Sequence, residues 1–106
     1  MLPETITVPP EALADFCRRW QVSELALFGS VLRPDFKPES DVDVLVTFAP
    51  EAEWGLFDHV QMQQALKALF QREVDLVSRR AIERSPNHIR RNAILSTAQV
   101  IYDAAR

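Results

Sequence analysis

Two segments decide the fold of this 106-residue chain: Leu25–Ser30, which reads LALFGS, and Ser40–Val46, which reads SDVDVLV. The first predicts a strand that ends in a Gly-Ser turn and leads into a short helix. The second predicts an apolar strand that begins with two aspartates. Because residues i and i+2 of a strand point to the same face, Asp41 and Asp43 are expected side by side, with Cα atoms roughly 6.5 Å apart.

The aspartate pair and the Gly-Ser turn together indicate metal and nucleotide chemistry. Two carboxylates on one face repel each other unless a cation lies between them or one is protonated. Gly29 permits close approach of a ligand to the backbone, and Ser30 stands where free helical N–H groups can meet a phosphate. Taken singly, the turn is an ordinary helix cap and the acids are a solvated strand start. Their combination, flanked by two apolar strands, favours a site.

These residues resemble a known family. Gly29-Ser30, ten further residues and then Asp41-Val42-Asp43 are similar to the signature of the nucleotidyltransferase superfamily related to DNA polymerase beta. The small size and the flanking residues resemble its minimal members, the MNT-type antitoxins that pair with HEPN toxins. The resemblance extends over about residues 10–102 and includes the later Val74–Val77. Pro34 departs from it, since many relatives carry glycine or an acid there.

The resemblance implies a function as well as a fold. Asp41 and Asp43 would hold two Mg²⁺ ions, and Asp75 would complete the second metal site and help to take a proton from the attacking hydroxyl. Gly29 and Ser30 would hold the phosphates of ATP, with Arg33 near enough in sequence to neutralise charge. By resemblance, the reaction is transfer of AMP to a tyrosine of a HEPN ribonuclease toxin, which silences the toxin.

Length and composition set limits on the class of protein. A chain of this length is one domain, with residues 1–9 expected to form an N-terminal arm. Hydrophobic residues make up 47%, which is enough for one core, and no apolar run is long enough to span a bilayer. The single cysteine, Cys17, excludes an internal disulfide and favours the cytoplasm. The net charge of −3 argues against broad nucleic-acid binding.

The remaining pattern predicts an α/β (α+β) fold, a small mixed sheet flanked by helices. A helix is expected to begin at Pro9-Pro10 and to bury an i, i+3, i+4, i+7 stripe. Its members are Leu13, Phe16, Cys17 and Trp20. Strands are expected over residues 25–28, 42–48, 73–77 and 99–102, and a helix over 56–70. Ser85-Pro86 predicts the start of another helix, with Ser85 as its cap.

Asp75 lies in the third expected strand, on the side of Val77. If that strand lies beside the second one, Asp75 can join the other two aspartates on one face. Three hard oxygen ligands suit Mg²⁺, whereas no Cys/His set supports zinc. His59 and His88 are isolated, and we expect both on the surface of helices.

The segment from Arg79 to Arg91 is unevenly charged, with five arginines facing one glutamate. It is either a solvated helix surface or a contact to triphosphate or to an acidic or RNA-like partner. Two other functions also stay open: an antitoxin that neutralises its partner by contact alone, and a nucleotidyltransferase for small molecules. The intact aspartates argue against the first, and the lack of room for an acceptor-binding domain argues against the second.

Overall fold

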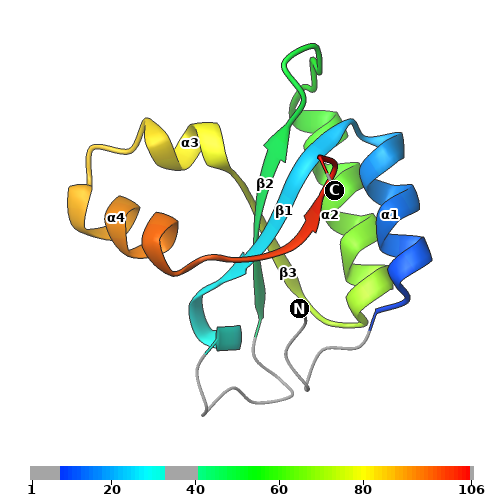
Figure 1. The fold of residues 1–106 in the computed structure, drawn as a ribbon, viewed down its shortest axis with the longest axis horizontal. Helices are drawn as coiled ribbons and strands as arrows, with labels where there is room; N and C mark the ends of the chain where they lie inside the picture. Colours follow the sequence, from blue (N-terminus) through cyan, green and yellow to red (C-terminus); the bar gives the residue numbers. More distant parts are fainter. Residues whose placement is uncertain (1–7, 33–40, 106) are drawn as a thin grey trace.

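The computed structural model describes residues 8–32 and 41–105. Strands and helices alternate along most of the chain, and two consecutive helices precede the last strand (Figure 1). In order they are α1 (Pro10–Arg19), β1 (Val22–Phe28), the 3₁₀ helix η1 (Gly29–Leu32), β2 (Val42–Phe48), α2 (Leu56–Phe70), β3 (Val74–Ser78), α3 (Arg79–Glu83), α4 (His88–Thr97) and β4 (Gln99–Asp103). Among the described helices, none combines the length and apolar character needed to cross a membrane.

The strands form one mixed sheet in the order β3-β2-β1-β4. β2 pairs with β3 in parallel, and β1 pairs with both β2 and β4 in antiparallel fashion. The predicted mixed sheet is therefore confirmed. β2 is buried on both faces, since Val44, Leu45 and Val46 are all buried. The predicted last strand is present as β4, which lies at the edge of the sheet.

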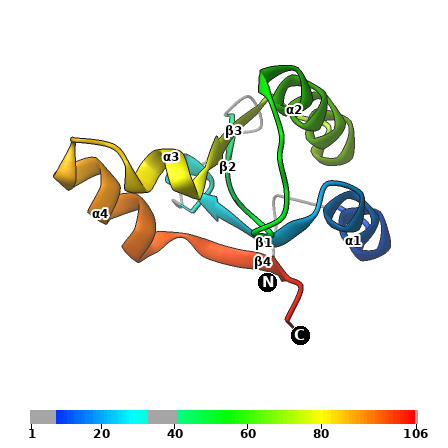
Figure 2. The same cartoon turned by 90° about the horizontal axis from the view of Figure 1, so that it is seen from above.

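Helices α1 and α2 cover one face of the sheet (Figure 2). The predicted α1 stripe is confirmed, because Leu13, Phe16, Cys17 and Trp20 are all buried in the main core. Burial raises the pKa of the Cys17 thiol to about 12, which leaves it protonated and unreactive at neutral pH. Val8, within the expected N-terminal arm, is also buried in this core.

Helices α3 and α4 lie on the opposite face and project to one side of the sheet (Figures 1 and 2). A second, smaller cluster joins Ile82 of α3 and Ile94 of α4 to three sheet residues. The sheet residues are Ala26, Phe28 and Leu45. The sequence does not predict α3, which follows β3 without a loop because Ser78 caps it: the Ser78 hydroxyl accepts a hydrogen bond from the Ala81 N–H at 3.1 Å.

The predicted cap of the last helix is wrong. α4 begins at His88, and its cap is Asn87, whose side-chain oxygen accepts a hydrogen bond from the Arg90 N–H at 3.1 Å. Ser85 instead accepts a hydrogen bond from the Asn87 N–H, so it shapes the turn before the helix. Asparagine caps as well as serine does, and the sequence offers both within three residues.

Two polar residues interrupt the apolar side of α2, and both secure the edge strand β3. Gln63 Oε1 accepts a hydrogen bond from the Leu76 N–H at 3.2 Å. Lys67 Nζ lies 3.1 Å from Glu73 Oε1, just before that strand. An edge strand exposes unpaired backbone groups. A partly buried backbone group without a hydrogen-bond partner lowers the stability of the folded state. The two polar residues of α2 therefore stabilise the edge strand of the sheet.

We expect Gln63→Ala to lower the free energy of unfolding by about 1–2 kcal/mol, because it leaves the Leu76 N–H without its acceptor. The control is Gln64→Ala, the same change at the next, exposed position of the same helix, which should stay within about 0.5 kcal/mol of wild type. Urea denaturation followed by circular dichroism measures both. Equal effects of the two substitutions would show that the hydrogen bond contributes nothing.

Candidate active site at one end of the sheet

The strand register brings two of the predicted site residues together. Asp43 of β2 is the direct partner of Asp75 on β3, so their backbones lie about 4.8 Å apart and their side chains share a face. Asp43 also faces Phe28 at the end of β1. Asp43 is half-buried and Asp75 is exposed. The prediction that the third strand would bring Asp75 beside the second is therefore confirmed.

Gly29 follows β1 directly and gives the Asp43 carboxylate its space. Its φ is +76°, in the left-handed region that side chains rarely adopt. A Cβ placed on it would lie 2.2 Å from Asp43 Oδ2, far inside van der Waals contact. The sequence suggests a phosphate role for Gly29. The structure adds a second reason for glycine, because any side chain here would displace the carboxylate.

Asp41 is exposed and comes immediately before β2. Pairing begins at the next residue, where the Val42 N–H donates to the Glu73 carbonyl at 2.9 Å. Within residues 8–32 and 41–105, no three acidic, histidine or cysteine side chains converge tightly enough to hold a metal ion. Strand pairing brings together two of the three aspartates, Asp43 and Asp75. Asp41 lies two residues before Asp43 in the sequence.

Of the other two predicted nucleotide-binding residues, Ser30 and Arg33, the structure describes the position of Ser30 only. Ser30 lies in η1, directly after Gly29, as expected for a short helix at the end of the first strand. Arg33 lies outside the described residues, as does Pro34.

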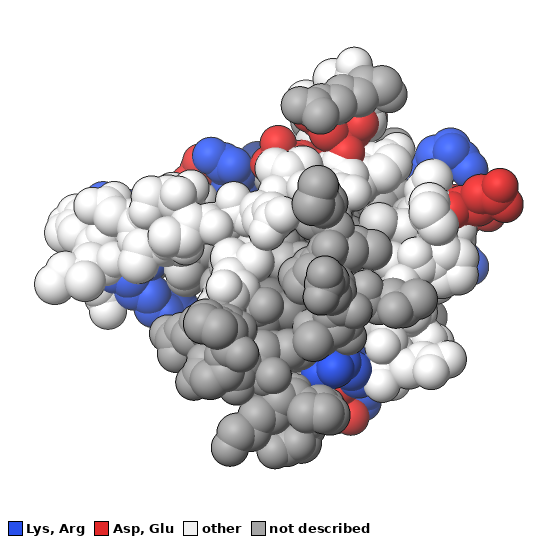
Figure 3. Space-filling view, turned by 60° about the horizontal axis from the view of Figure 1, so that its bottom comes forward, with Lys and Arg blue, Asp and Glu red and all other residues white. Residues whose placement is uncertain are grey.

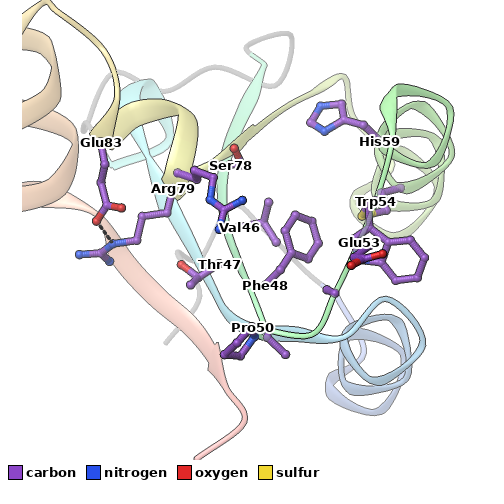
Figure 4. Close-up of a pocket in the computed structure, with 15 residues that line it drawn as sticks. Val46, Thr47, Phe48, Pro50, Glu53, Trp54, His59, Ser78, Arg79 and Glu83 are labelled. Atoms are coloured by element: carbon purple, nitrogen blue, oxygen red, sulfur yellow. Dashed lines mark hydrogen bonds and ion pairs between the residues drawn. The ribbon is translucent and has the colours of Figure 1, made fainter.

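A cavity of about 600 Å³ lies at the other end of β2, and sequence reasoning missed it (Figure 4). Phe48, Trp54 and His59 line one side, and Arg79 and Glu83 line the other. His59 is thus half-buried against this hollow, not a freely exposed surface residue. Gly29, Asp41, Asp43 and Asp75, the predicted site residues that the structure describes in full, do not border it. Its residues come from four separate elements at irregular spacing, so no sequence motif could mark it.

Comparison with known proteins identifies the family. A family model described as the nucleotidyltransferase domain matches residues 10–100. The chain belongs to this family. A solved structure of a candidate minimal nucleotidyltransferase is 32% identical, with a TM-score of 0.63 over 88% of this chain and 87% of the other. The mixed sheet with its flanking helices is thus the nucleotidyltransferase fold.

Two further relatives of this nucleotidyltransferase domain are informative. Over 65 residues, 61% of the chain, it is 37% identical to the protein adenylyltransferase MntA of Thermococcus cleftensis, and it spans 64% of the length of that curated relative. The crystal structure of a toxin-antitoxin with AMP-PNP superposes with a TM-score of 0.68 at 18% identity, over 91% of this chain and 74% of that one. At that identity the superposition shows a shared fold.

We expect Gly29→Ala to destabilise the domain by at least about 2 kcal/mol, from left-handed strain and displacement of the Asp43 carboxylate. Gly55→Ala is the matched control, because its Cβ would lie 3.9 Å from Asp58 Oδ2, an ordinary contact. Chemical denaturation measures both. Combining Gly29→Ala with Asp43→Ala should cost less than the sum of the two, since the clash disappears. Strict additivity would contradict the proposed contact.

Proposed function

We propose that this chain is a Mg²⁺-dependent nucleotidyltransferase that acts as an antitoxin, transferring AMP from ATP to a tyrosine hydroxyl of a cognate HEPN ribonuclease toxin. The observation that carries the proposal is the pairing of Asp43 with Asp75 beside Gly29, where any side chain would meet the Asp43 carboxylate. Family membership supports the reaction class. The 37% identical relative is a protein adenylyltransferase, which supports a protein as the acceptor.

The chemistry of the three carboxylates suits magnesium, and the sheet brings two of them, Asp43 and Asp75, together. All three aspartates offer hard oxygen ligands, and the space that Gly29 leaves open lets the Asp43 carboxylate reach the end of β1. Asp41 and Asp43 would hold the ions, with Asp75 as the third ligand. Bound Mg²⁺ would neutralise charge on the triphosphate and favour ionisation of the attacking hydroxyl.

The chain's own residues then position the reactants. The backbone at Gly29-Ser30 would donate to the β- and γ-phosphates, with Arg33 close to the same charge. Asp75, exposed on the edge strand, would face the acceptor hydroxyl and help to take its proton. The hydroxyl oxygen bonds to the α-phosphorus, the bond from that phosphorus to the bridging oxygen breaks, and pyrophosphate leaves.

The alternative with an observation in its favour is an antitoxin that neutralises a toxin by contact alone. The structural neighbour with AMP-PNP is a toxin-antitoxin, and at 18% identity it shares the fold without settling the chemistry. Catalysis and binding make different predictions for the aspartates, because a binder does not need them. The two following experiments separate these functions.

Asp43→Asn should reduce AMP transfer at least ~1,000-fold while leaving the fold intact, because the loss of a metal ligand removes several kcal/mol of transition-state stabilisation. Glu51→Gln, the same change at an exposed loop acid, should leave transfer unchanged. Intact-mass spectrometry of the acceptor gives the rate. Thermal shifts add a second readout: Mg²⁺-ATP should raise the melting temperature of wild type much more than that of Asp43→Asn. Near-normal transfer by Asp43→Asn would overturn the two-metal assignment.

The mass of the protein encoded by the neighbouring reading frame should rise by whole AMP units when that protein is incubated with this chain, Mg²⁺ and ATP. Omitting ATP, or adding EDTA, should abolish the increase because both the donor and the ions are required. The double variant Asp41→Ala/Asp43→Ala is the control. If this variant inhibits the partner as well as wild type does, with no mass change in either case, the chain is a non-catalytic binder.

A further inference from the structure

The segment formed by α3, α4 and the turn between them, residues 79–98, differs in charge from the rest of the protein. We call it the basic arm. It carries five arginines and one glutamate, a formal charge of +4, although the whole chain carries −3. Such a concentration of one sign on one projection creates a local field that the net charge conceals.

Two of the five arginines hold the arm together. Arg79 Nε lies 3.3 Å from Glu83 Oε2, and its Nη1 lies 3.6 Å from Glu24 Oε1 on β1 (Figure 4). Arg91 Nη1 donates to the carbonyls of Glu83 and Ser85 at 3.5 and 3.3 Å, which closes the turn between the helices. The one acid of the arm is therefore paired within it.

The other three arginines, Arg80, Arg84 and Arg90, are exposed. None of them forms a salt bridge with any acid in the described part of the chain. Figure 3 shows blue atoms on the underside of the projection at the left of the view, below its white surface. The arm thus presents three arginines that no acid of residues 8–32 or 41–105 neutralises through a salt bridge.

The arm also exposes an apolar side chain, next to one of these arginines in the sequence. Ile89 is 85% exposed, beside Arg90 in the first turn of α4. Ile94 is the buried residue of this ten-residue helix, which projects from the sheet with little support (Figure 1). Helices of this length are marginal in isolation, and a fully exposed isoleucine adds nothing to their stability. Exposed apolar side chains and arginines are both characteristic of protein interfaces, where a buried apolar contact is combined with polar surroundings.

We propose that the basic arm is the docking surface for an acidic face of the acceptor protein, with Ile89 entering an apolar socket and Arg80, Arg84 and Arg90 facing carboxylates. This inference rests on the proposed function, which makes the acceptor of AMP a protein. Charge complementarity selects an acidic partner. Nucleic acid fits less well, because a phosphate backbone offers no socket for Ile89 and three exposed arginines give a small footprint.

Binding of the purified protein from the neighbouring reading frame, measured by titration calorimetry, tests this directly. Arg84→Glu/Arg90→Glu should weaken binding at least ~10-fold, as should Ile89→Ser. Arg18→Glu/Arg19→Glu is the matched control: it makes the same change in charge at exposed positions of α1, which covers the opposite face of the sheet. The control should bind within about 2-fold of wild type, and all variants should keep the wild-type circular dichroism spectrum.

The outcomes separate docking from catalysis. Asp43→Asn should bind the partner as wild type does, and Arg84→Glu/Arg90→Glu should keep the full thermal response to Mg²⁺-ATP. Tight, arm-dependent binding without AMP transfer would leave the docking surface standing and overturn the proposed function. AMP transfer together with equal binding by all variants would support the proposed function and overturn the docking surface. Absence of binding by the wild type would also overturn the docking surface. If the arm variants lose affinity for tRNA and not for the protein, the arm binds nucleic acid and the proposal is wrong.

Discussion

The pairing of β2 with a strand on each side is the interaction on which the rest of the structure depends. Phe28, at the end of β1, and Asp75, near the start of β3, are both partners of Asp43. A shift of either register by one residue would turn the opposing side chain to the other face. The same ladder that buries Val44 and Val46 in the main core therefore places two carboxylates side by side.

The two faces of the sheet serve different purposes. α1 and α2 cover one face with a large apolar core, from Phe16 and Cys17 to Leu66 and Phe70. The other face carries a smaller cluster under α3 and α4 and, on the same side, the aspartates. A half-covered face is what a site needs, because reactants must enter while the opposite core supplies the stability. The basic arm extends from this less covered side.

Aromatic contacts fix the loop that joins β2 to α2. Trp54 Nε1 donates to the Trp20 carbonyl at 2.8 Å, and the two rings meet edge to face with centroids 5.1 Å apart. Such a contact buries a large apolar area, and its hydrogen bond fixes the orientation of the Trp54 ring. It ties the loop to the end of α1, and Trp54 forms part of the wall of the cavity at the far end of β2.

Local patterns in the sequence determined much of this protein. These patterns predict the bounds of β2 and α2 and the buried stripe from Leu13 to Trp20, because apolar periodicity is a local property. The spacing of Gly29, Asp41 and Asp43 indicates the family for the same reason: a turn and a strand start are short-range features.

Other features were decided by tertiary structure alone. The sequence cannot show that a glycine Cβ would strike the Asp43 carboxylate, because that contact joins residues fourteen positions apart through strand pairing. Nor can it show that Gln63 accepts a hydrogen bond from the Leu76 N–H, or that Asn87 and not Ser85 caps α4. It also cannot show which arginines of the basic arm are paired internally. These outcomes depend on which chain segments lie next to each other in space, and side-chain periodicity carries no information about that.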